Sequence, residues 1–111
     1  MTDIEINKLC AEAMGWRKHK LSAITMYNEE SGASMPRAAW NPLHDDAQAM
    51  TLYKKFPMNI QHAALSSADN WVVESIEISE DNFCAWVADK SLNRAICECV
   101  AKMHQNSPRT T

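Results

Sequence analysis

The stretch that decides the fold is residues 83–104, FCAWVADKSLNRAICECVAKMH. Its second half predicts an amphipathic helix, because apolar residues recur every three or four positions, at Leu92, Ala95, Ile96, Cys99, Val100 and Met103. Its first half, residues 83–88, is apolar at every position, which is typical of a strand covered on both faces. We therefore expect a central or near-central strand, followed by a helix against which the rest of the chain packs.

Ile96 lies at the centre of this apolar pattern and Arg94 lies on the opposite, polar face. Truncating a core isoleucine to alanine removes buried apolar surface and leaves a cavity, so Ile96→Ala should destabilise the fold by about 2–5 kcal/mol. Arg94→Ala, on the face predicted to meet solvent, should change stability by no more than about 0.5 kcal/mol.

The length and composition are those of one globular domain covering residues 1–111, with 46% hydrophobic and 23% charged residues. The formal charge of −3 argues against a general nucleic-acid or anionic-membrane surface, which requires concentrated Lys and Arg. The sequence has neither a long apolar run nor an apolar signal core near Met1. We expect a cytoplasmic protein without a membrane or nucleic-acid partner.

The remaining elements follow from local patterns. Thr2 and Glu5 have capping-box spacing and begin a predicted helix at 3–14, and a second predicted helix spans 44–56. Between them we expect a short strand at 21–27 and a long loop at about 28–42. An edge strand near 60–64 and an antiparallel hairpin of 71–78 with 83–88 precede the last helix, and residues 106–111 form a frayed tail.

The predicted class is therefore α+β. We expect a small antiparallel sheet of about three strands, with a fourth possible, packed with three helices in helix–sheet–helix layers.

The candidate ligand-binding residues are those of the one basic run with its aromatic neighbour, together with a tryptophan of the predicted loop. They are Trp16, Arg17, Lys18, Lys20 and Trp40. An indole can stack on a ring while the cations contact an anionic group. The alternative is a solvated strand or loop face with Trp16 as a core anchor.

Neither a metal site, a cofactor nor a catalytic residue is expected. The run His44-Asp45-Asp46 is better explained as a helix cap, because adjacent helical residues point in different directions and cannot all face one ion. Cys97 and Cys99 lack the two-residue spacing and second pair of a zinc site. The four cysteines are expected to be free, as is usual in the cytosol.

Several short motifs resemble those of the phage ABA-sandwich domain proteins, which are small phage and prophage proteins without an assigned activity. The motifs are Gly15-Trp16, Trp40-Asn41-Pro42 with Asp45, Trp71 with Val73, and Ala88 followed by Ala95-Ile96-Cys97. The resemblance implies a helix–sheet–helix fold and supplies no catalytic residues. Residues 17–37 depart most from it, since they contain few aromatic residues.

Our leading hypothesis is a non-enzymatic phage or prophage accessory protein, in the host cytoplasm, that binds a host protein or another copy of itself. Four tryptophans and seven methionines without a reactive cluster favour it, because both residue types are common at adaptable interfaces. The alternative is a small-ligand or nucleotide-binding module that uses residues 16–20 and the long loop. A third hypothesis is a hydrolase that uses His44 and Asp45.

Overall fold

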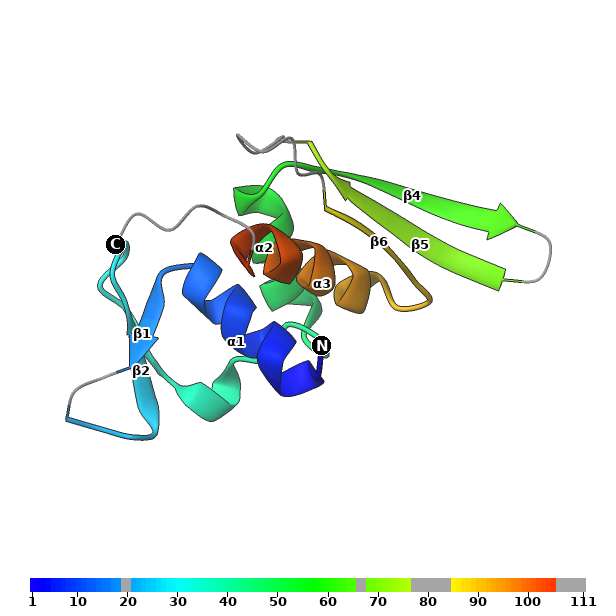
Figure 1. Ribbon diagram of the computed structural model, residues 1–111. Helices are drawn as coiled ribbons and strands as arrows, with labels where there is room; N and C mark the ends of the chain where they lie inside the picture. Colours follow the sequence, from blue (N-terminus) through cyan, green and yellow to red (C-terminus); the bar gives the residue numbers. More distant parts are fainter. Residues whose placement is uncertain (19–20, 66–67, 77–84, 106–111) are drawn as a thin grey trace.

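The computed structural model describes residues 1–18, 21–65, 68–76 and 85–105. These residues form three α-helices, a short 3-10 helix and six strands, and the strands pair into two antiparallel sheets of three strands each. Figure 1 shows the helices lying between the two sheets. The predicted tail at 106–111 lies outside the described residues.

Helix α3 (Leu92–Gln105) is the centre of the fold, as its sequence predicts. It packs against strands β5 and β6 and also against helices α1 and α2. The predicted apolar face is buried at Ala95, Ile96, Cys99 and Val100, with Leu92 and Met103 partly buried. Cys97 and Ala101 are also fully buried, because neighbours cover the helix on more than one side and widen its buried face.

Helix α1 (Asp3–Ala13) confirms the first predicted helix. The Thr2 hydroxyl accepts a hydrogen bond from the backbone N–H of Glu5 at 3.2 Å, which satisfies one of the free donors at the helix start. The helix ends before Gly15, whose φ of 89° is a conformation that glycine adopts without strain. Ile6 and Cys10 are buried against α3, so α1 covers the side of α3 away from the β4–β6 sheet.

Helix α2 (Asp46–Lys55) confirms the second predicted helix, two residues shorter at its start than expected. Asp45 is its N-cap, and its Oδ1 accepts a hydrogen bond from the backbone N–H of Gln48 at 3.0 Å. The predicted capping role of this acidic run is thereby confirmed for Asp45.

The larger sheet contains β4 (Met58–Leu65), β5 (Ala68–Ser75) and β6 (Trp86–Asp89), in the order β4-β5-β6. The antiparallel pairing of β5 with β6 confirms the predicted hairpin partners, with Val73 opposite Val87. Strand β4 lies at an edge of the described sheet, also as expected.

The expectation of a covered, central strand at 83–88 is wrong for the described part of that segment. Strand β6 is at the other edge of the sheet, and Trp86 is 56% exposed. Ala85 and Val87 face α3 and are buried, whereas Trp86 and Ala88 point away from it. A run that is apolar on both faces does not show whether both faces are covered. Phe83 and Cys84 lie outside the described residues.

The smaller sheet contains β1 (Trp16–Lys18), β2 (Thr25–Asn28) and β3 (Ser34–Pro36), and the 3-10 helix η1 (Arg37–Ala39) follows it. The prediction of a long loop at about 28–42 is therefore wrong, and the strand expected at 21–27 begins later. Strands this short carry too few residues for a clear alternation of apolar and polar side chains.

The α+β class is confirmed, but the arrangement of the sheets differs from the prediction. There are two sheets rather than one, with all three helices between them instead of on both faces of one sheet (Figure 1). Buried residues from α1, α2, α3 and the β4–β6 sheet form one hydrophobic core. The β1–β3 sheet contributes a single residue to the buried apolar set, Met26, and reaches the helices through β1 and α1.

Candidate functional site

A groove of about 1000 Å³ lies between α1 and the β1–β3 sheet. We call it the α1–β groove. Most of its surface is apolar, as in small-molecule sites, which combine apolar walls with a few polar groups. Its lining residues are Ile4, Asn7, Lys8, Ala11, Glu12, Trp16, Arg17, Lys18, Ala23, Ile24, Met26, Pro36, Arg37, Ala38 and Trp40.

Four of the five candidate ligand-binding residues line this groove. Trp16, Arg17 and Lys18 reach it from β1, and Trp40 from the segment after η1, more than twenty positions later in the chain. The fifth candidate, Lys20, lies outside the described residues.

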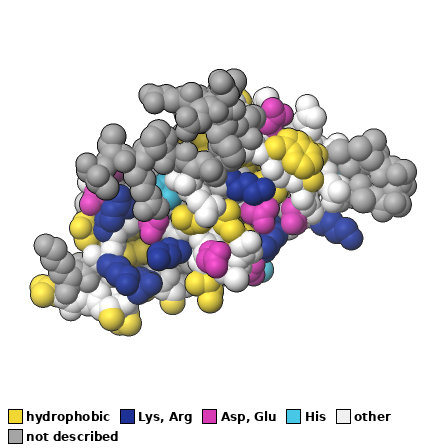
Figure 2. All heavy atoms as spheres, in the orientation of Figure 1, with side chains coloured by type: hydrophobic (Ala, Val, Ile, Leu, Met, Phe, Trp, Pro, Cys, Tyr) yellow, Lys and Arg dark blue, Asp and Glu magenta, His cyan; other side chains and the backbone are white. Residues whose placement is uncertain are grey.

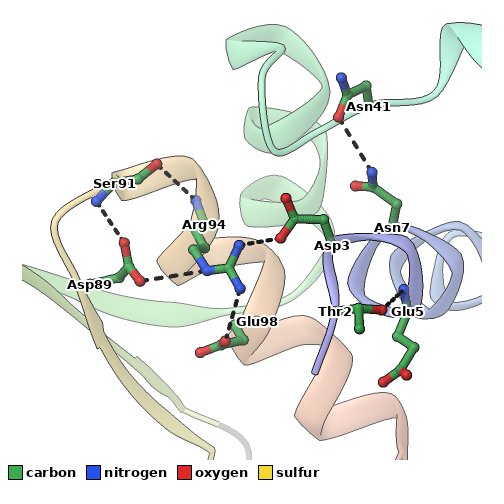
Figure 3. Close-up of polar contacts among 9 residues, drawn as sticks. All are labelled: Thr2, Asp3, Glu5, Asn7, Asn41, Asp89, Ser91, Arg94 and Glu98. Atoms are coloured by element: carbon green, nitrogen blue, oxygen red, sulfur yellow. Dashed lines mark hydrogen bonds and ion pairs between the residues drawn. The ribbon is translucent and has the colours of Figure 1, made fainter.

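Trp40 is held in place by helix α1. Its indole Nε1 donates a hydrogen bond of 2.9 Å to the backbone carbonyl of Asn7. The side chain of Asn7 donates in turn to Oδ1 of Asn41 at 3.3 Å, as Figure 3 shows. These two contacts fix the residues after η1 on α1, which closes one side of the groove.

Basic side chains outnumber acidic ones on the lining. Lys8, Arg17, Lys18 and Arg37 are the basic residues and Glu12 is the acidic one. Figure 2 shows Lys and Arg side chains beside hydrophobic ones over the end of the molecule that contains β1 and β2. The net charge of the groove lining is therefore positive, whereas the formal charge of the whole chain is −3.

The basic residues of the groove differ in how many polar contacts they already make within the protein. Arg17 lies 3.6 Å from a carboxylate oxygen of Glu29 and donates to the backbone carbonyls of Glu12 and Trp16. Arg37 donates to the backbone carbonyl of Ala23 at 3.2 Å. Within the described part of the chain, no acidic side chain lies within 4.0 Å of the charged groups of Lys8, Lys18 or Arg37.

Two isoleucines on the groove lining are unusually exposed. Ile4 of α1 is 81% exposed and Ile24, just before β2, is 75% exposed. Sequence reasoning missed both, as well as Lys8 and Arg37. For Ile4 the sequence did contain a signal. It lies outside the apolar face of its helix, which indicates an apolar side chain that does not enter the core.

A second cavity of about 440 Å³ adjoins the same two tryptophans. Trp16 and Trp40 line it together with Met14, Asn28, Glu30, Ser31, Met35, Gln48 and Thr51. Glu30 in this cavity is paired with Lys55, with 2.7 Å between the carboxylate oxygen and Nζ. The two indoles are therefore the side chains common to both cavities.

The other candidates from the sequence have structural roles or no assembled partners. Asp46, next to the cap residue Asp45, accepts a hydrogen bond of 2.7 Å from the Asn93 side chain, which joins α2 to α3. The ring of His62 packs on Trp71 with 4.7 Å between centroids. In the described ranges, no three His, Cys, Asp or Glu side chains are grouped so that they could hold a metal ion.

Three cysteines, Cys10, Cys97 and Cys99, are buried thiols outside any disulfide. The thiol of Cys10 donates to the backbone carbonyl of Cys97 at 3.2 Å. Hydrogen bonding with Cys97, reinforced by burial, raises the pKa of the Cys10 thiol far above its usual range. A thiol that stays protonated and buried is a poor nucleophile, so this cluster is part of the packing between α1 and α3.

The ionic cluster around Arg94 is also structural. Arg94 of α3 contacts the carboxylates of Asp3, Asp89 and Glu98, which Figure 3 shows converging on the guanidinium. The hydrogen bond from Arg94 lowers the pKa of Asp3 below its usual value, and the same bond raises the pKa of Arg94. The sequence predicted that Arg94 lies on a face that meets solvent. In the structure its guanidinium instead has three carboxylate partners.

Comparison with known proteins adds no relative. The chain matches no family model, no curated protein and no solved structure. None of the described helices is long and apolar enough to cross a membrane.

Proposed function

We propose that the protein is a binding module that holds a small organic anion in the α1–β groove. The observation that carries the proposal is that Trp16 and Lys18 of β1 meet Trp40, from the segment after η1, on one largely apolar cavity. Its volume of about 1000 Å³ is at the upper end of the range for drug-sized ligands.

The charge of the groove supports an anionic ligand. Lys8, Lys18 and Arg37 come from α1, β1 and η1, and no described carboxylate neutralises them. An anion next to them would gain electrostatic energy without breaking an existing ion pair. The apolar floor would favour a ligand that also has an apolar part.

The proposed role is binding without catalysis. Among the described residues of the lining, none is a histidine, cysteine, serine or threonine, and Glu12 is the one carboxylate. Glu12 itself lies 3.4 Å from Nε2 of His104. A nucleophile with a nearby general base, the arrangement used in covalent acyl transfer, is not assembled on these side chains.

The test is thermal unfolding in the presence of small anions. A compound that binds the folded state alone stabilises it, and about 1 mM of a ligand with a Kd near 10 μM would contribute about 2.7 kcal/mol. Lys18→Glu should abolish the shift in Tm. Lys90→Glu is the matched control, because it makes the same change of charge at an exposed position outside the groove. If no anion in the panel shifts Tm at this concentration, the proposal fails.

A second candidate function, binding a protein partner or another copy of the chain, is favoured by one observation. Trp86 is 56% exposed on the face of β6 that points away from α3. Large exposed aromatic residues are common where proteins meet. If this face is an interface, light scattering should give a mass above the monomer for the wild type, and Trp86→Glu should reduce that mass. The proposed phage or prophage origin still depends on the sequence resemblance.

A further inference from the structure

The two tryptophans of the α1–β groove share an unusual position. Trp16 and Trp40 both line the larger groove, and both also line the second cavity. Each of the two residues is partly buried and borders two cavities, and Trp40 also packs against the hydrophobic core.

The polar atom of one ring is already engaged. Nε1 of Trp40 donates to the backbone carbonyl of Asn7, which fixes the ring to α1. What this indole offers a ligand is its apolar surface and not a hydrogen bond. Aromatic rings stack favourably on such a surface in offset or edge-to-face geometry.

We infer that the ligand of the groove is a planar aromatic anion of the nucleoside phosphate class. Its ring would pack on Trp16 and Trp40, which line both cavities, and its phosphate would lie by Lys8, Lys18 and Arg37. This inference rests on the proposed function and narrows it from any small organic anion to one with a flat ring.

The charges and the rings together favour this class over an aliphatic anion. A fatty acid would use the apolar floor and one cation, and it would gain nothing specific from the aromatic character of Trp16 and Trp40. A nucleoside phosphate uses both features, since base–aromatic stacking contributes to affinity for any base and the cations contact phosphate oxygens. Phosphate contacts made by exposed Lys and Arg also make the binding weaker at high salt.

The experiment is calorimetric titration of the full chain with three probes: adenosine monophosphate, ribose 5-phosphate and octanoate. We expect adenosine monophosphate to bind at least tenfold more tightly than the other two. Equal affinity for octanoate and the nucleotide would overturn the aromatic inference and leave the proposed anion-binding function standing. Absence of binding by all three at about 1 mM would overturn both.

Variants locate the site. Trp16→Leu should weaken the nucleotide at least tenfold while leaving octanoate binding, if any, unchanged, and Lys18→Glu should weaken every anion. Trp86→Leu removes an exposed tryptophan on the β4–β6 sheet and should leave the affinity for all three probes unchanged.

Because Trp16→Leu can disturb β1, quenching of intrinsic fluorescence by the nucleotide provides a second readout in the unmutated protein. The inference fails if the nucleotide leaves that fluorescence unquenched, or if a folded Trp16→Leu protein binds it as well as the wild type.

Discussion

The guanidinium of Arg94 donates a hydrogen bond to the carboxylate of Asp3, a residue 91 positions earlier in the chain. Arg94 also lies 3.6 Å from Asp89 and 3.8 Å from Glu98 (Figure 3). One cation thus links the first turn of α1, the end of β6 and the start of α3. These contacts join the start of the first helix to the last helix.

Arg94→Ala should therefore cost more than a typical surface substitution. We expect a loss of about 1–2 kcal/mol of unfolding free energy, because three carboxylates lose their shared cation and the side chain is 30% exposed. Urea unfolding measures it. Lys54→Ala, on the exposed side of α2, is the control and should stay within about 0.5 kcal/mol. Equal midpoints for the two variants would show that the Arg94 cluster contributes nothing.

The Asp3–Arg94 pair also predicts a dependence on pH. The pKa of Asp3 is lower in the folded protein than in the unfolded chain, where it is about 3.9. Its contribution to stability is therefore complete above that value and is lost as the pH falls through the lower, folded pKa.

The stability difference between wild type and Asp3→Asn should accordingly be constant near neutral pH and shrink below about pH 4. Denaturant unfolding at a series of pH values measures this difference. The same substitution made in the Arg94→Ala background is the control, and there it should have a small effect at every pH. A difference that does not shrink at all as the pH falls below about 4 would contradict the assignment.

The helices were predictable because their signals are local. The 3.6-residue period of α3, the cap at Thr2 and the cap at Asp45 each involve residues within a few positions of one another. The exposure of Trp86 was not predictable in this way. It depends on which face of β6 the helix α3 covers, and the apolar run at 83–88 carries no information about that choice.

One part of the candidate site was predictable, because its residues are neighbours in the sequence. Trp16, Arg17 and Lys18 are adjacent, so their composition alone marked them. Their meeting with Lys8 and Arg37 depends on the β1–β3 sheet folding back on α1, and that sheet was expected to be mostly loop. Contacts such as Trp40 with Asn7, 33 positions apart, place the second indole and have no local signal.

Ile96→Ala should be among the most costly single truncations in the chain. Ile96 is 1% exposed and belongs to the core shared by α1, α2, α3 and the β4–β6 sheet. The lost apolar burial and the cavity left behind should reduce stability by about 2–5 kcal/mol, measured by urea unfolding. Lys54→Ala replaces Arg94→Ala as the surface control, since Arg94 has ionic partners. If the Ile96 and Lys54 variants unfold together, the assignment of the core is wrong.

The last prediction concerns Asn28, which ties the β1–β3 sheet to α1. Its side chain is almost fully buried and makes three hydrogen bonds. The amide nitrogen donates to the backbone carbonyl of Met14 at 2.9 Å, and the oxygen accepts from the backbone N–H groups of Glu30 and Ser31. Since the sheet adds little to the main core, these bonds should decide how often it opens on its own.

Asn28→Ala should therefore accelerate hydrogen exchange of the β1–β3 amides by about tenfold or more, which corresponds to about 1.4 kcal/mol, with a much smaller effect in α3. Mass spectrometry of exchanged peptides separates the two regions. Ser34→Ala, an exposed change in the same sheet, is the matched control and should leave exchange unaltered. Equal acceleration in α3 would mean that the sheet and the core unfold as one unit. In that case the α1–β groove could not open without global unfolding, and its two sides would be as rigid as the core.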